Sequence, residues 1–122
     1  MAVFIGYYRM HPDAAAEVAA RERAGQPGLN PRLRELVLEL PEKLTSTCRI
    51  VAAYSPMAGA VLSDTPPPGV TIVETDNPAD LQFISAYYAG FAIYHWVPAT
   101  RVGTDRHERA AWAAGGAPVG GR

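Results

Sequence analysis

Two short segments of the sequence, Ala2 to Met10 and Phe91 to Val97, are apolar or aromatic at nearly every position. Side chains along a strand alternate between the two faces of a sheet, so a strand with one wet face carries polar residues at every second position. Neither segment shows this alternation. Both are therefore expected to be strands buried on both faces, and the fold has to cover two sides of one sheet.

The rest of the chain supplies two more strands and three helices. Prolines mark helix starts at Pro12, Pro31 and Pro78, and a stripe of leucines runs along the second helix. Pro41 is expected to end that helix and Pro98 to end the last strand. The expected elements are strands at 2–10, 48–55, 69–75 and 91–97 and helices at 12–24, 31–41 and 78–90.

This order predicts an α+β fold of the ferredoxin-like type, β-α-β-β-α-β, with a further helix inserted after the first helix. Such a fold has a four-stranded antiparallel sheet that carries both of its helices on one face. The other face is also apolar, and a second copy of the same sheet is the simplest cover for it. A homodimer formed through the open sheet face is therefore expected.

The chain is expected to form one domain over residues 1–102, followed by a C-terminal extension at 103–122. In this extension, Thr104 is expected to start a short helix whose Trp112 anchors the tail on the partner protomer, and the glycine-rich end is expected to be disordered. The proline-rich segment 56–68 is too long for a tight turn and is expected to be a functional or disordered connection.

Composition excludes several classes of protein. The net charge of −1 offers no general attraction to nucleic acid or to an anionic membrane. No apolar run reaches the roughly 18 residues of a membrane span, and no basic segment precedes the short apolar run at the N-terminus, so a cytoplasmic protein is expected. Cys48 is the single cysteine, which excludes an intrachain disulfide, a zinc ribbon and a c-type haem motif.

The segment GVTIVETDNPADLQFISAYYAGFAIYHWVPA, residues 69–99, resembles the C-terminal half of small proteins in the dimeric α/β-barrel superfamily, in particular branches known only as domains of unknown function. The first strand fits the resemblance loosely, and the leucine helix and the C-terminal tail look like additions. The resemblance implies a pocket between sheet and helices. Members include cofactor-free monooxygenases of aromatic polyketides, haem-degrading or haem-binding enzymes and lactone isomerases. No catalytic residue carries over, because the Asn, Trp and His set of the haem-degrading enzymes is not found.

His95 interrupts an apolar strand, on the face expected to hold Phe91, Ile93 and Val97. One interpretation makes it a general base or an axial ligand, because an imidazole titrates near neutrality. The other makes it a neutral histidine that is hydrogen-bonded in the core or lies at the dimer seam. The choice depends on which face of the strand looks toward the helices.

Six tyrosines are many for 122 residues, and as a group they indicate a pocket for a planar or partly apolar ligand. The first and last strands pair antiparallel in the expected fold, so the pair Tyr7-Tyr8 is expected within reach of the pair Tyr94-His95. The alternative is that each tyrosine fills space and leaves its hydroxyl at the surface. The residues assigned to the site are His95, Tyr7, Tyr54 and Tyr88 for catalysis and Arg9, Tyr94 and Trp96 for substrate binding.

Four further residues have two interpretations each. Cys48 is either a nucleophile or thiolate ligand, or a small buried hydrophobic residue. His11 lies with Arg9 at the mouth of the expected pocket, or it belongs to a turn and helix start. Glu74 and Asp76 are either a pair of acid-base carboxylates or structural residues before a helix.

Three functions follow as hypotheses. The first is a small dimeric enzyme, without a cofactor, that acts on a hydrophobic or aromatic metabolite by proton transfer, cyclisation or oxygenation; the resemblance implies a place in secondary metabolism. The second is a haem or metal enzyme with His95 or His11 as a ligand and Cys48 as a less favoured one. The third is a ligand-binding or assembly protein without catalysis.

Overall fold

The computed structural model describes residues 1–26, 30–55 and 68–115. Most of the proline-rich connection, at 56–67, and the expected disordered tail, at 116–122, lie outside the described residues. Within the described residues no helix is both long and apolar enough to cross a bilayer.

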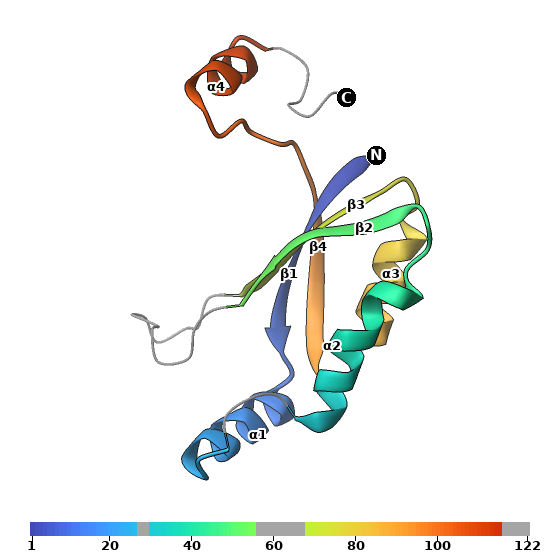
Figure 1. Cartoon of the computed structure of the whole chain (residues 1–122), viewed down its shortest axis with the longest axis vertical. Helices are drawn as coiled ribbons and strands as arrows, with labels where there is room; N and C mark the ends of the chain where they lie inside the picture. Colours follow the sequence, from blue (N-terminus) through green and yellow to red (C-terminus); the bar gives the residue numbers. More distant parts are fainter. Residues whose placement is uncertain (27–29, 56–67, 116–122) are drawn as a thin grey trace.

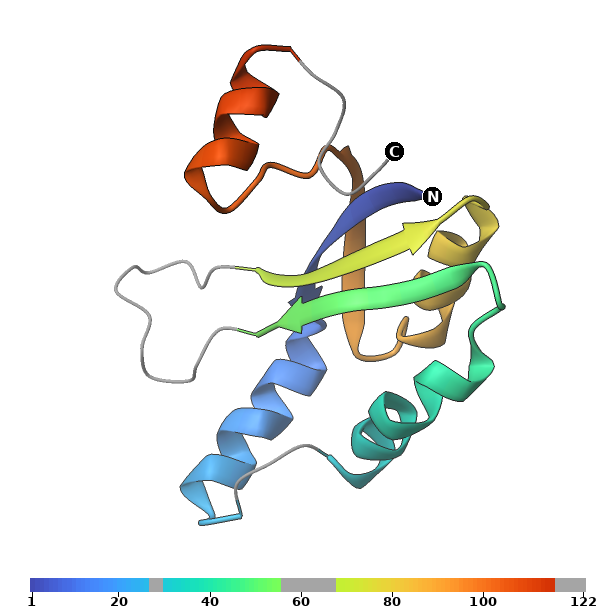
Figure 2. The same ribbon diagram turned by 45° about the horizontal axis from the view of Figure 1, so that its top comes forward.

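Four strands and four helices make up the described fold. Their bounds are β1 Ala2–Met10, α1 Pro12–Arg23, α2 Pro31–Lys43, β2 Cys48–Tyr54, β3 Gly69–Thr75, α3 Ala79–Tyr87, β4 Ala92–Ala99 and α4 Arg106–Ala113. The strands form one antiparallel sheet in the order β2-β3-β1-β4, with β2 and β3 side by side at one edge (Figure 2). This is the strand order of a ferredoxin-like α+β fold, so the predicted fold class is confirmed.

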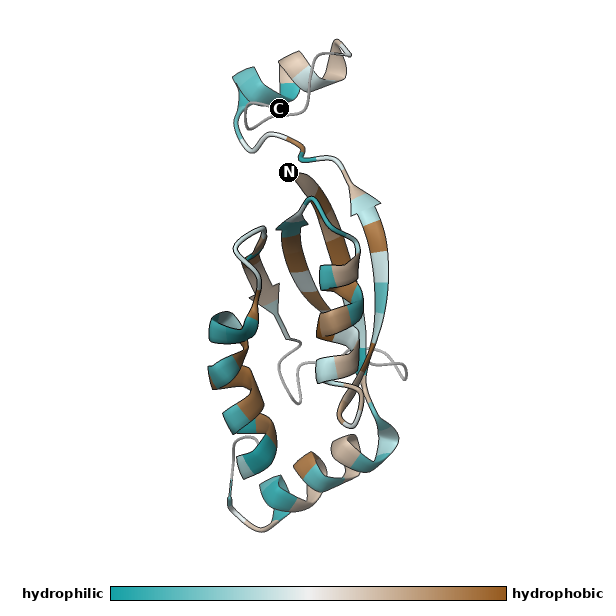
Figure 3. Cartoon of the chain, turned by 90° about the vertical axis from the view of Figure 1, so that its right-hand side faces the viewer, coloured by the Kyte–Doolittle hydropathy of each residue, from teal (hydrophilic) through white to brown (hydrophobic). Residues whose placement is uncertain are grey.

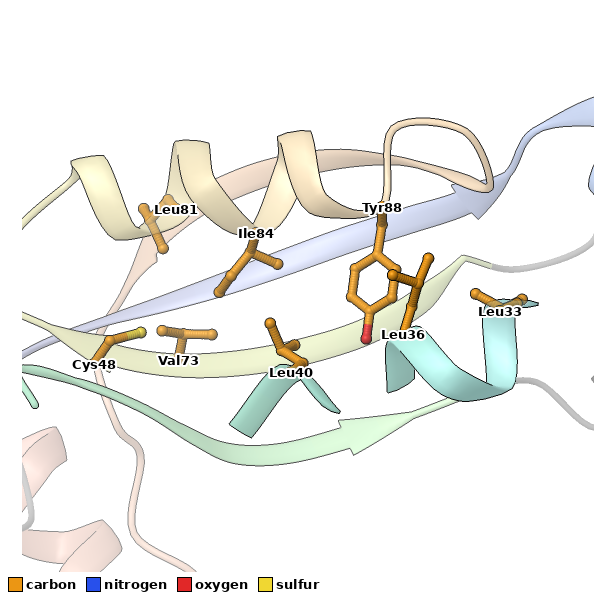
Figure 4. Packing of buried hydrophobic residues seen from close by; sticks show 8 residues of the cluster. All are labelled: Leu33, Leu36, Leu40, Cys48, Val73, Leu81, Ile84 and Tyr88. Atoms are coloured by element: carbon orange, nitrogen blue, oxygen red, sulfur yellow. The ribbon is translucent and has the colours of Figure 1, made fainter. Parts of the chain in front are cut away.

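Two helices, α2 and α3, lie on one side of the sheet (Figure 1). The leucine stripe of α2 is turned toward the sheet and α3, as the hydropathy colours show (Figure 3), and it packs with Val73 and Ile84, both fully buried. The core formed in this way, drawn in Figure 4, consists of Leu33, Leu36, Leu40, Cys48, Val73, Leu81, Ile84 and Tyr88.

The first two helices exchange the roles expected of them. The leucine helix α2, which looked like an addition, covers the sheet, whereas α1 lies beyond the strand ends (Figures 1 and 3) and buries only Ala14. The physical reason is side-chain size, because an alanine-rich face removes much less apolar area from water than a leucine stripe does.

The second face of the sheet is not covered by any described helix, and α4 lies past the end of β4 with no buried residue (Figures 1 and 3). We call this second face the open face. Strand alternation and the register place on it Val3, Ile5, Tyr7, Arg9, Arg49, Ala52, Tyr54, Val70, Ile72, Glu74, Ile93, His95, Val97 and Ala99. Both faces of the sheet were expected to be buried, but in a single chain only the face toward α2 and α3 is.

Three expected boundaries are wrong. Pro41 lies inside α2, which continues to Lys43, because a proline near a helix end removes a single hydrogen bond. Pro98 lies inside β4, opposite Phe4, and is tolerated there because β4 is an edge strand. The cap of α4 is Asp105 rather than Thr104, since an Asp105 carboxylate oxygen accepts a hydrogen bond from the Glu108 backbone N at 2.8 Å.

Candidate functional site

The sheet divides the predicted site residues into two groups. Tyr7, Tyr54, Arg9 and His95 lie on the open face, whereas Tyr88, Tyr94 and Trp96 lie on the helix side. The predicted proximity of the pair Tyr7-Tyr8 to the pair Tyr94-His95 is confirmed by the strand register, in which Tyr7 pairs with His95 and Tyr8 pairs with Tyr94. A single site within one chain cannot contain both groups, because the sheet separates them.

Five aromatic side chains meet on the helix side, and we call them the aromatic cluster: Tyr8, Tyr87, Tyr88, Tyr94 and Trp96. Tyr94 is at its centre, with ring centroids 5.2 Å from Tyr8, 5.2 Å from Trp96 and 6.1 Å from Tyr88. The Tyr94 and Trp96 rings are nearly parallel, at 9°, and Tyr87 meets Tyr88 edge to face. These are the stacked and edge-to-face arrangements that aromatic quadrupoles favour.

Backbone geometry explains why these rings come together. Tyr94 and Trp96 are two residues apart on β4 and so point to the same side, and Tyr8 on β1 is directly opposite Tyr94. Tyr87 and Tyr88 come from the end of α3, and Tyr88 reaches toward Leu36 of α2 (Figure 4).

Two glycines leave room for the rings. A Cβ at Gly6 would lie 2.5 Å from Cζ3 of Trp96, so the indole ring occupies the space above this residue. A Cβ at Gly69 would overlap the ring of Tyr8 in the same way. At both positions an aromatic ring of the same chain lies close against the backbone, and only glycine, which has no Cβ, leaves space for it.

Hydrogen bonds fix the orientation of the cluster. The Trp96 indole N–H donates to Oγ of Ser85 on α3 at 2.8 Å, and the Tyr87 hydroxyl donates to the Leu36 carbonyl at 2.7 Å. The Tyr8 hydroxyl is hydrogen-bonded to the Ser55 hydroxyl. The sheet and both covering helices are therefore joined through aromatic side chains.

Burial raises the pKa of three phenols in the cluster, those of Tyr87, Tyr88 and Tyr94. Burial is the main cause that raises the pKa of Tyr88 far above its usual range, and the neighbouring Tyr94 adds to it. Burial likewise raises the pKa of Tyr94, partly offset by a hydrogen bond with Thr71. Both side chains are thus neutral hydrogen-bond donors at any physiological pH.

The cluster is not fully enclosed. Tyr88 is buried, but Tyr8, Tyr94 and Trp96 are only half-buried although they lie on the side that the helices cover. Parts of these three rings therefore remain accessible to solvent, and two of them, Tyr94 and Trp96, are stacked.

On the open face, His95 is exposed, and one row across the sheet contains Tyr54, Val70, Tyr7 and His95. Tyr54 and His95 are three strand spacings apart, roughly 14 Å, so they cannot act on the same small group. Phe91, expected on the face of His95, instead packs against the core on the helix side.

Three other candidates have structural roles. Cys48 is buried, and its burial together with the negative charge of Asp80 raises the pKa of the thiol, which opposes a nucleophile or thiolate ligand. His11 caps α1, its Nδ1 accepting a hydrogen bond from the Asp13 backbone N at 3.3 Å. Glu74 forms an ion pair with Arg49 at 3.0 Å.

A haem or metal site was the alternative to a cofactor-free site. Among residues 1–26, 30–55 and 68–115, no group of three His, Cys, Asp or Glu side chains could hold a metal ion. Two of the residues predicted as haem or metal ligands do not lie in the aromatic cluster, because His95 faces the opposite side of the sheet and Cys48 is a buried thiol.

A buried carboxylate, that of Asp80, was not predicted. Asp80, at the start of α3, is buried and accepts hydrogen bonds from the hydroxyls of Thr75 at 2.5 Å and Thr45 at 3.1 Å. It ties α3 to the end of β3 and to the turn before β2. The sequence signal for this role is weak, because an acidic residue in the first turn of a helix is already explained by the helix dipole.

The chain matches no protein-family model, no curated protein and no solved structure. The inference of function therefore depends on the geometry of the aromatic cluster and of the open face.

Proposed function

We propose that the protein binds a planar, partly apolar metabolite against the aromatic cluster and works as a homodimer joined through its open faces. The observation that carries the first part is the partial exposure of Tyr8, Tyr94 and Trp96 on the side that the helices cover. Fully buried rings would indicate a core, and fully exposed rings would have no fixed geometry. These rings are held in position and remain accessible.

The chemistry of the cluster favours a ligand with an oxygen acceptor. Stacking on the nearly parallel rings of Tyr94 and Trp96 holds a flat ring system. Phenols that keep their protons donate to a carbonyl, or to an enolate oxygen as negative charge develops on it. This supports an aromatic ketone, phenol or quinone as the ligand, with its oxygen accepting a hydrogen bond from a phenol of the cluster.

The predicted role of His95 as the base of this reaction receives no support from one chain, because its ring lies on the opposite face from the cluster. The ligand-binding part of the proposal therefore does not depend on His95. Hydrogen-bond donation by Tyr94, which is half-buried, is the contribution to binding that the geometry favours, whereas Tyr88 is buried behind it.

The homodimer is supported by the side chains of the open face. Tyr7, Tyr54, Ile93 and Val97 are 40%, 69%, 61% and 41% exposed, although they lie on strands of a four-stranded sheet. Apolar groups gathered on one face mark an interaction surface. The ion pair of Arg49 and Glu74 lies at one end of this face and Arg9 lies toward the other end, so the rows between them carry no carboxylate, lysine or arginine that would repel an identical copy.

Fluorescence of Trp96 tests the ligand proposal. Trp112 is first replaced by Phe, which leaves Trp96 as the single tryptophan. Titration with naphthols, naphthoquinones and flavones is expected to quench or shift the Trp96 emission with saturation. Tyr94→Phe keeps the ring but removes the hydrogen-bond donor, and is expected to raise the dissociation constant of carbonyl-bearing ligands about threefold to tenfold. Tyr7→Phe, on the open face, is the matched control. No saturable change with any of the three classes would contradict the proposal.

A further inference from the structure

His95 lies within the apolar part of the open face. Tyr7 is directly opposite it on β1, and Ile93 and Val97 flank it along β4. Arg9 is on the diagonal, as the partner of Ile93 in the register. β4 is an edge strand, so among the described strands β1 is its single neighbour in the sheet. The imidazole is thus surrounded by apolar groups, one phenol and one guanidinium.

The open face has few groups that could compensate a positive charge on this ring. Its charged and titratable side chains are Tyr7, Arg9, Arg49, Tyr54, Glu74 and His95. Glu74 is the single carboxylate among them, and it is engaged by Arg49 at 3.0 Å. Glu74 also lies in the row of Val3 and Ala99, four residues along β4 from His95. The nearer charge, Arg9, has the same sign as an imidazolium.

We infer that proton binding to His95 opposes association of the two copies, so that the homodimer dissociates as the pH falls through the range in which histidines titrate. This inference rests on the homodimer proposed above. A second copy laid on the open face removes water from the ring, and a charge in apolar surroundings without a partner is strongly disfavoured, whereas a neutral imidazole is not. The free chain therefore binds the proton more tightly than the dimer does, and by linkage each proton taken up shifts the equilibrium toward single chains.

Sedimentation velocity of the full chain at about pH 8 and about pH 5.5, on either side of the histidine range, tests this inference. The dissociation constant of the wild-type dimer is expected to rise at least about tenfold at the lower pH, since each copy takes up a proton. His95→Gln keeps a neutral polar side chain of similar size and is expected to give the same dissociation constant at both values. The double variant His11→Gln and His107→Gln removes the other two histidines and is expected to keep the wild-type response.

The outcomes separate the two proposals. A wild-type dimer with the same dissociation constant at both pH values overturns the role of His95 and leaves the homodimer intact. A His95→Gln dimer that still weakens at low pH overturns it as well. A single chain at both values overturns the homodimer itself, and the role of His95 with it. Far-ultraviolet circular dichroism at both values establishes that each variant is folded.

Discussion

Gly69 lies directly beneath the ring of Tyr8, so that a single methyl group at this position would overlap the phenol. We expect Gly69→Ala to lower the free energy of unfolding by about 1–3 kcal/mol, since Tyr8 would have to leave its place beside Tyr94 and its hydrogen bond with Ser55. Chemical denaturation measures this change. Gly90→Ala is the matched control, because a Cβ there meets nothing within 4 Å and its backbone φ is not positive. Equal free energies of unfolding for the two variants would contradict the close packing of Tyr8 against Gly69.

Ser85 is the acceptor for the Trp96 indole. Ser85→Ala leaves that N–H without its acceptor in a half-buried position, and we expect a loss of about 1–2 kcal/mol of unfolding free energy. In the Trp112→Phe background the emission of Trp96 should shift as well, since its environment changes. Ser46→Ala, at an exposed serine, should change neither quantity. An unshifted emission maximum in Ser85→Ala would show that this hydrogen bond does not orient the ring.

The fold class was predictable because strands and helices each carry a local signal. The strand pairing followed from the order of elements, and it correctly placed Tyr7 and Tyr8 opposite His95 and Tyr94. Which helix packs on the sheet was mispredicted, although the leucine stripe of α2 was already visible. A helix with leucines on one face gains more by covering a sheet than the alanine-rich α1.

The face that His95 occupies could not be predicted, because both alternating sets of β4 are apolar or aromatic. The side is decided by packing between segments far apart in sequence, such as Trp96 above Gly6 and against Ser85. One signal was available. A glycine inside a strand indicates a close approach by another group, and Gly6 lies opposite Trp96 in the register.

The raised pKa of Tyr88 predicts a pH dependence of stability at alkaline pH. The folded state holds this proton more tightly than the unfolded chain, whose tyrosines titrate near 10.0. The stabilisation is therefore fully present below about pH 10 and is lost as the pH rises further. Tyr88→Phe should reduce the slope of the unfolding free energy above this value by up to about 1.4 kcal/mol per pH unit.

Denaturant titrations at several alkaline pH values measure this slope. Tyr54→Phe removes a phenol from an exposed side chain outside the cluster and is the matched control. If Tyr88→Phe and the wild type lose stability in parallel above pH 10, a raised pKa of Tyr88 in the folded state is contradicted.

Val97 and Val37 provide a matched pair for the dimer. Both valines are exposed to a similar degree, 41% and 44%, but Val97 lies on the open face and Val37 on α2. Lysine at position 97 would place a charge within the proposed interface, where burying an unpaired ammonium group is strongly disfavoured. We expect Val97→Lys to raise the dissociation constant of the dimer at least about a hundredfold, which corresponds to about 2.7 kcal/mol, whereas Val37→Lys should leave it unchanged. Light scattering over a dilution series measures both. A dimer that survives Val97→Lys but dissociates with Val37→Lys would place the interface on the helical layer instead of on the sheet.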